Sequence, residues 1–297
     1  MTGDGRDDAG LPLFYRSLRS IDSERDSGRR FRHGGYAFAR TAVAIPLGAE
    51  EIPRAASDYP IIFSGGPQPI ALAVVGLVEQ DNLFVDEHGH WLAGAYLPAW
   101  VARYPFILTD DSANRRLVLC VDDESGFLDA AQGTPLFEDG APTAFLSQAM
   151  EFCLDLHNRQ AASNEFTKSL VDYMLLEESD ARLETPGGVV EFRGVRTISR
   201  AQFDQLHDNV ILDWRRRGWL ELIYAQLQSA SRWETLKRLF DRRTETGESA
   251  LPGFDQPVSD KVPAPGDDAP PSLPAAIDER LPVGFRLQRR PGKGSEY

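Results

Sequence analysis

The hydrophobic pattern of this 297-residue chain changes period near its middle, and this change constrains the fold more than any other feature. Before residue 143, apolar residues form short runs of strand length, each broken by proline or glycine. From Thr143 onward they recur every three or four residues, as in amphipathic helices. The sequence therefore predicts an α+β fold, with a mixed, mainly antiparallel sheet in the N-terminal half and packed helices in the C-terminal half.

Individual elements follow from the same pattern. Strands are expected at residues 36–47, 61–63, 70–77, 83–85, 91–92, 106–108, 117–121 and 189–192. Helices are expected at residues 49–57, 99–103, 199–218 and 233–240. The region 143–174 forms either a helical hairpin or one long helix with an exposed middle, and residues 219–227 fit a strand or a helix. The run at 70–77 is almost wholly apolar, so we expect it to lie inside the sheet.

Composition divides the chain into three parts. Residues 1–32, rich in charged and small residues, are expected to form a flexible N-terminal arm. Residues 33–243 are expected to form a single α+β body, long enough to bury a core without a disulfide or metal. Residues 244–297 are expected to be a disordered, proline-rich tail, because few large apolar residues are available to offset the entropy of ordering.

The charge of the chain excludes several classes of function. A net charge of −13 without a dense basic patch disfavours binding to nucleic acids and to anionic membrane surfaces. The longest apolar stretch, residues 69–78, is far shorter than the roughly 20 residues that span a bilayer. The N-terminus lacks the apolar core of a signal peptide, so we expect a cytoplasmic protein without membrane insertion. Cys120 and Cys153 lie in apolar surroundings and are expected to be buried, reduced thiols.

Only weak signals for catalysis appear. His88 and His90, flanked by Asp86 and Glu87, could offer two imidazoles to a divalent metal, but the same residues are ordinary in a solvated hairpin turn. The acidic loop at 122–124 could bind a cation, although such loops are usually just solvated. No nucleophile elbow, dinucleotide-binding glycine motif or P-loop is present. The sequence thus predicts no cofactor, with a metal at His88 and His90 as the alternative.

A dense group of aromatic residues is the most informative feature. Such rings, with an arginine among them, are either core or the anchors of a groove that binds an extended peptide. The candidate groove residues are Trp91, Tyr96, Trp100, Arg103 and Tyr104.

Aromatic–proline motifs in this region give the chain a resemblance to a known family. The segments that carry it are residues 59–63, 82–86, Gly89, Trp91, 96–100, 103–108, 222–225, Leu227 and Ser229. In order and spacing they resemble the SapC family over most of residues 11–241. The resemblance implies a bacterial protein of a family named after a member of a surface-layer locus. Proteins of this family are often found beside TonB-dependent receptors and halogenase-like flavoproteins, and the resemblance implies no established activity. Gln226 stands where the family usually has histidine.

These observations favour a non-catalytic role without assigning a reaction. We expect a cytoplasmic accessory factor that binds a protein or peptide partner, and the resemblance connects it with envelope, surface-layer or TonB-dependent receptor systems. The alternative is a metal-dependent enzyme that modifies a small molecule or peptide.

Overall fold

The computed structural model describes residues 11–78, 80–111, 116–129, 131–185, 188–246 and 287–290. Within these ranges, the chain divides into two compact units. The first contains residues 11–33 and Tyr104–Cys153, and the second contains Gly34–Arg103 together with the described residues from Leu154 onward. The expected body at 33–243 includes residues of both units.

The first unit is built from short antiparallel strands. One sheet has the order β1-β7-β6, and a second has the order β8-β2-β9. Strands β10 and β11 pair with each other. Their bounds are β1 Leu18–Ser20, β2 Arg30–Phe31, β6 Phe106–Asp111, β7 Arg116–Asp122, β8 Leu128–Asp129, β9 Thr134–Pro135, β10 Phe137–Glu138 and β11 Ala141–Pro142.

Aromatic rings fill the interior of this unit. Phe31 stacks on Phe145 with ring centroids 4.7 Å apart, and Phe106 lies 5.7 Å from Phe31. Phe127 meets Phe31 edge to face at 6.1 Å. These rings come from segments far apart in sequence, so the unit depends on long-range packing of aromatic residues.

Residues 11–32, part of the stretch for which the sequence analysis expects a flexible arm, belong to this unit; residues 1–10 lie outside the described ranges. Strand β1 pairs with β7, and Tyr15 donates a hydrogen bond from its hydroxyl to the Phe106 carbonyl at 2.7 Å. Asp26 has no exposed surface and forms a bidentate pair with Arg19, with both contacts at 2.9 Å. The charged composition that suggested a solvated segment instead supplies an internal ion pair.

The second unit contains a larger antiparallel sheet. Its strand order is β12-β13-β4-β5-β3, and β14 pairs with β13 beside this path. Strand β5 lies inside the sheet, between β4 and β3, and all of its residues are buried, as its apolar composition predicts. The bounds are β3 Ala44–Leu47, β4 Ile61–Phe63, β5 Ala71–Val74, β12 Leu176–Thr185, β13 Gly188–Ile198 and β14 Leu287–Arg290.

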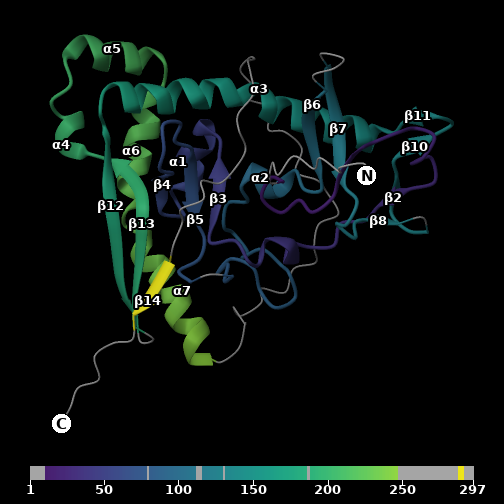
Figure 1. The fold of residues 1–297 in the computed structure, drawn as a ribbon, viewed down its shortest axis with the longest axis horizontal. Coiled ribbons are helices and arrows are strands. Elements are labelled where there is room, and N and C mark those ends of the chain that lie inside the picture. The colour runs from purple at the N-terminus through teal and green to yellow at the C-terminus, as the bar shows by residue number, and fades with distance from the viewer. Residues whose placement is uncertain are drawn as a thin grey trace, which may run out of the picture. The chain divides into compact units, whose positions relative to one another are not determined.

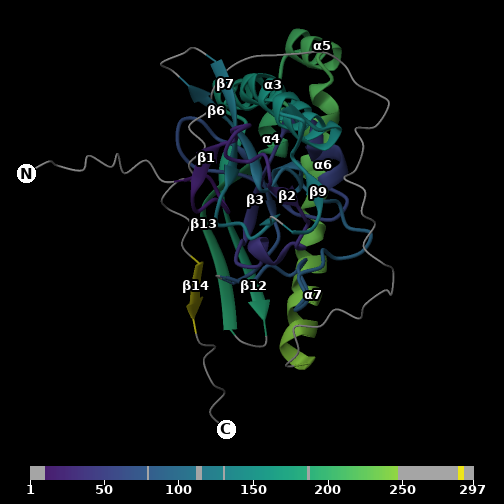
Figure 2. The same cartoon turned by 90° about the vertical axis from the view of Figure 1, so that its right-hand side faces the viewer.

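Helices accompany this sheet. Helix α6 packs against α1, β4 and β13, and α7 packs against β12. Figures 1 and 2 show α6 and α7 running beside the long β12–β13 hairpin. The helices are η1 Ala37–Ala39, η2 Ala49–Glu51, α1 Ile52–Ala55, α2 Ala99–Ala102, α3 Ala144–Asp172, α4 Arg200–Phe203, α5 Asp208–Arg216, α6 Trp219–Ser229 and α7 Arg232–Thr246.

Helix α6 is hydrogen-bonded to β4 by two buried side chains. The Ile61 N–H donates to Ser229 Oγ at 3.0 Å, and Gln226 Nε2 donates to the Ile61 carbonyl at 2.9 Å. Ser229 Oγ in turn donates to the Gln226 carbonyl at 2.6 Å. Both backbone groups of a buried strand residue are thus satisfied by a helix about 165 positions later in the chain.

The fold confirms the α+β class and settles the open alternatives. Residues 144–172 form one long helix, the boundary between the units falls within it, and residues 219–229 are helical. The expected strand at 36–47 begins only at Ala44, after a 3₁₀ turn. The expected helix at 199–218 is two helices, α4 and α5, and Gly218 then adopts a left-handed conformation before α6.

Strand β12 was missed by the sequence analysis, and with β13 it brings the second half of the chain into the sheet. The expected tail begins within α7, and it includes β14. The rest of the tail, residues 247–286 and 291–297, lies outside the described residues.

Candidate functional site

The segment 91–103, which carries most of the candidate groove residues, is held in place by a buried carboxylate. Glu51, at the end of η2, is only 7% exposed. Its Oε1 accepts hydrogen bonds from the Tyr96 hydroxyl and the Ala99 N–H, both at 2.8 Å. Its Oε2 accepts the Gly48 N–H at 2.7 Å. Burial raises the pKa of Glu51, and these donors oppose that effect.

A second anchor lies at Asp58 and Tyr59, just after α1. The Tyr59 hydroxyl donates to the Tyr96 carbonyl and accepts the Trp91 indole N–H at 3.2 Å. Asp58 Oδ2 accepts the Tyr96 N–H at 2.8 Å. Burial raises the pKa of the Tyr59 and Tyr96 phenols, so both hydroxyls remain neutral donors at neutral pH.

Trp91 is half-buried between other rings of the same unit. Its ring lies 6.3 Å from that of Phe84 in a stacked arrangement, and 5.9 Å from Tyr36 edge to face. Its backbone forms an antiparallel bridge with Val85. Packing on two sides fixes the indole in one orientation, while part of its surface stays accessible.

Trp100 and Arg103 form a stacked pair at the short helix α2. The Arg103 guanidinium carbon lies 3.7 Å from the centroid of the Trp100 ring, and both side chains are half-buried. A cation over an indole at this distance is a favourable cation–π contact. Pro98 precedes the helix, and the Tyr104–Pro105 peptide that follows is cis.

We call Trp91, Tyr96, Trp100 and Arg103 the aromatic surface. All four lie in the second unit and are half-buried, so the structure places them between the two alternatives, sealed core and open groove. Trp91 and Tyr96 are connected by hydrogen bonds, and Trp100 and Arg103 by stacking.

Tyr104, the fifth candidate, belongs to the first unit and is core. It is 5% exposed, its ring meets Tyr15 at 5.3 Å and Phe127 at 5.6 Å, and its hydroxyl donates to Asp122 Oδ2 at 2.8 Å. Asp122 also accepts the Ser17 N–H at 2.8 Å. This part of the acidic loop at 122–124 therefore serves packing of the first unit.

His88 and His90 lie on a turn organised by Asp86. Asp86 Oδ1 accepts the backbone N–H groups of His88 and His90 at 2.9 and 2.8 Å, and Oδ2 contacts His90 Nδ1 at 3.1 Å. Burial would raise the pKa of Asp86, but the hydrogen bonds from His90 and His88 lower it. Arg40 donates to the Asp86 and Glu87 carbonyls, both at 2.7 Å. The Asp86 carboxylate thus stabilises the turn that carries His88 and His90.

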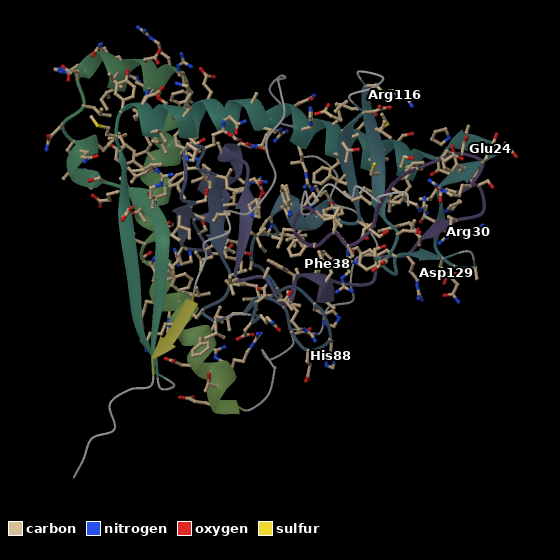
Figure 3. All side chains as sticks on the ribbon, viewed as in Figure 1. Glu24, Arg30, Phe38, His88, Arg116 and Asp129 are labelled. Carbon is tan, nitrogen blue, oxygen red and sulfur yellow. The ribbon has the colours of Figure 1, made fainter. Side chains whose placement is uncertain are left out.

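The geometry at these histidines offers at most two imidazole ligands. The rings are 6.0 Å apart, and the side chain of His88, labelled in Figure 3, points outward from the loop. Across the described ranges, no group of three or more His, Cys, Asp or Glu side chains is arranged to hold a metal ion. A metal at this turn would need ligands from elsewhere.

Glu51 and Tyr59 are residues of this site that the sequence pattern alone does not single out. Glu51 looked like an ordinary acidic residue in the first turn of a helix, and its partners at 96 and 99 are distant in sequence. Tyr59 was among the residues that carry the family resemblance, which is the one signal that could have found it. Cys120 and Cys153 are buried and not joined in a disulfide, as expected.

The fold and this surface define an α+β protein with fixed, partly accessible aromatic side chains. The chain belongs to the SapC family: the family model, described as SapC, matches residues 25–236. No curated protein and no solved structure matches the chain. Within the described part of the chain, no helix has the length and apolarity needed to cross a membrane.

Proposed function

We propose that this SapC-family protein is a non-catalytic binding factor that holds a protein or peptide partner on its aromatic surface. The observation that carries the proposal is the stacked pair of Trp100 and Arg103, which is half-buried and lies directly after a loop fixed by Glu51. Tryptophan, tyrosine and arginine are the residues most enriched among the energetic anchors of protein interfaces.

The anchoring of the loop supports this role because binding costs free energy when flexible groups must be ordered. Here the backbone at Tyr96 is fixed by Asp58 and Tyr59, and the backbone at Ala99 by Glu51. A surface ordered before binding loses less conformational entropy when a partner arrives. The part-exposed rings then offer apolar area to a partner segment, and Arg103 supports the Trp100 ring by stacking on it.

The proposal also includes the cellular location of the protein and the systems it serves. We place the protein in the bacterial cytoplasm, as an accessory factor connected with envelope, surface-layer or TonB-dependent receptor systems. The family membership and the context that the sequence resemblance implies support this placement.

A peptide-display selection on the full-length protein tests the proposal. Selected peptides are synthesised and titrated by calorimetry against the wild type and the variants Trp100→Ala and Arg103→Ala. We expect each variant to weaken binding at least about tenfold, as for interface anchors. Arg217→Ala is a matched control, because Arg217 also stacks on a tryptophan, Trp219, at 4.9 Å.

Retained affinity in both aromatic-surface variants would contradict the proposal, as would an equal loss in Arg217→Ala. Trp100→Phe keeps an apolar ring and serves if Trp100→Ala unfolds. If Trp100→Phe loses all binding and is also as unstable as Trp100→Ala, the ring is core and the proposed surface is wrong.

The alternative of a metal-dependent enzyme rests on His88 and His90 alone. Elemental analysis of untagged protein tests it: stoichiometric iron, zinc or manganese that disappears in a His88→Ala, His90→Ala double variant would favour the enzyme. We expect the double variant and the wild type to have the same metal content.

A further inference from the structure

One edge of strand β13 is covered only in part by its neighbour in the sheet, β4. On one side β13 pairs with β12 along its length. On the other side it pairs with β4 at a single position, Arg196 opposite Phe63. The residues Val189–Phe192 on that side lie beyond β4, and in the described part of the chain only β14 pairs with them.

A bulge separates these two parts of β13. Ser179 is opposite Val195, but Ala181 is opposite Phe192, so Asp180 faces two residues of β13. One of them, Gly194, has φ of +71°, in the left-handed region that favours glycine. Such bulges bend a strand and increase its twist. The bulge explains why β13 leaves β4 and presents its residues 189–192 as a separate edge.

This edge is supported by packing of Phe192 and by strand pairing on its other side. Phe192 has no exposed surface, and its ring lies 5.0 Å from that of Trp233 on α7. The β12–β13 pairing continues on the opposite side to the hairpin end. A strand edge supported in this way is a site where an extended chain can add by main-chain hydrogen bonds.

The occupant in this structure is the chain's own C-terminal segment. Residues 287–290 pair antiparallel with residues 192–189, as the yellow strand in Figure 1 shows. In sequence, Pro282 and Pro291 bracket this segment, and proline cannot donate to a strand ladder. These two prolines limit how far the strand at residues 287–290 can extend.

Charge favours this kind of occupant. The sequence of residues 286–293 contains Arg286, Arg289, Arg290 and Lys293 and no acidic residue, in a chain of net charge −13. The β12–β13 hairpin that receives it has five acidic residues, Glu177, Glu178, Asp180, Glu184 and Glu191, and three basic ones, Arg182, Arg193 and Arg196. Within the paired stretch of β13, Glu191 is the one charged residue, so a basic strand meets an edge that carries no positive charge of its own.

We propose that the β13 edge at Val189–Phe192 is a strand-addition site for an extended, arginine-bearing peptide of a partner protein, and that residues 287–290 fill it as a displaceable internal competitor. The internal strand is short and uses one edge only. Because it is attached to the same chain, it competes at an effective concentration on the order of millimolar. A partner segment therefore gains access to the β13 edge when its affinity for that edge, or its local concentration, is high enough to displace residues 287–290.

The test uses full-length protein in which the internal strand is disabled by Leu287→Pro and Arg289→Pro. A fluorescein-labelled peptide of residues 283–293 is titrated by fluorescence anisotropy against this variant, the wild type, and a control with proline at Ser295, outside the paired residues. We expect the double variant to bind the peptide about tenfold more tightly than the wild type and the control do.

Two methylated peptides separate strand addition from simple charge attraction. One is N-methylated at Leu287 and Arg289, the other at Gln288 and Arg290. Only alternate residues of an antiparallel strand donate to a given neighbour, so one peptide should lose at least about tenfold in affinity and the other should bind nearly as the unmodified peptide does.

Equal effects of the two methylation patterns, equal binding by wild type and double variant, or no binding by the double variant would each overturn the inference. So would a wild-type dimer that dissociates in the double variant, because the strand would then be exchanged between copies. The inference is independent of the aromatic surface: Trp100→Ala is expected to bind the peptide as the wild type does, so the two proposals fail separately.

Discussion

Ser229→Ala gives a sharp test of how α6 holds the sheet of the second unit. Ser229 is 1% exposed, and its Oγ is the acceptor for the Ile61 N–H at 3.0 Å. Alanine differs by one oxygen, so it removes that acceptor together with the hydroxyl that donates to the Gln226 carbonyl at 2.6 Å. The Ile61 N–H would then stay buried in β4 without a partner, since Ile61 is 2% exposed.

The larger part of the expected cost comes from the Ile61 N–H, which loses its acceptor. Leaving a buried donor unsatisfied costs about 1–3 kcal/mol, which is more than the net value of an average hydrogen bond. For a cooperative unit of roughly 150–250 residues, each 1 kcal/mol lowers Tm by about 2–4 °C. Ser229→Ala should therefore lower the free energy of unfolding by about 2 kcal/mol and Tm by about 4–8 °C.

Tryptophan fluorescence in a urea titration is the suitable assay. The chain has five tryptophans, at 91, 100, 214, 219 and 233, and all of them lie in the second unit. Their emission therefore reports on the unit that contains Ser229. Ser231→Ala is the matched control, because that hydroxyl is exposed and donates to the Gln228 carbonyl at 3.0 Å.

The control should stay within about 0.5 kcal/mol of the wild type, as surface substitutions usually do. A loss below about 0.5 kcal/mol in Ser229→Ala would refute the reasoning, since the Ile61 N–H would then have found another partner. Equal losses in both serine variants would also refute it.

Three further predictions concern other positions. Met174 has φ of +55° and a side chain that is 76% exposed, so Met174→Gly should raise the unfolding free energy by about 0.5–1 kcal/mol in the same urea assay. Gly133 has φ of +107°, and a Cβ there would lie 2.2 Å from the Phe31 carbonyl oxygen, so Gly133→Ala should cost at least about 1–3 kcal/mol by calorimetry, and an unchanged transition would contradict this. Burial, followed by the charge of Glu51, raises the pKa of Glu50 from 4.5 to about 7, so the folded state keeps a proton that the unfolded state releases, and stability should fall as pH rises from about 4.5 to 7. Solvent screens part of this effect because the Glu50 side chain is 35% exposed, and urea midpoints at pH 5 and pH 8 should show a smaller decline in Glu50→Gln than in the wild type.

Local signals in the sequence were sufficient for several elements. The apolar run at 70–77 contains an interior strand, and the loop signal after residue 63 marks the end of β4. Pro98 marks the start of α2, whose extent differs from the expected helix by one residue. These features depend on hydrophobic period and on proline geometry, which neighbouring residues determine.

Other features depend on partners distant in sequence. The polar middle of α3 left a helical hairpin and one long helix as alternatives. In the long helix Ser163 Oγ accepts the Ala49 N–H at 2.9 Å, and Arg159 lies 3.8 Å from Glu50. Strand β12 is rich in charge and sits at the edge of its sheet, so its sequence carried no buried apolar run to reveal it.

The candidate site also combines features that local sequence reveals with features that depend on distant partners. The aromatic group at 91–104 was evident from composition, and four of its five proposed residues lie half-buried in one unit. That Tyr104 is core follows from its hydrogen bond to Asp122 and its contact with Tyr15, neither of which local sequence encodes. The carboxylate of Glu51 beneath the loop could be recognised only once the chain was folded.

Hydrogen exchange of the full-length protein, with and without a display-selected peptide, tests the binding proposal most directly. We predict slower exchange of backbone amides within residues 91–103 when the peptide is bound, and no such slowing in Trp100→Ala at the same peptide concentration. Tight binding by the wild type with unchanged exchange across 91–103, and slowing confined to other segments, would contradict it.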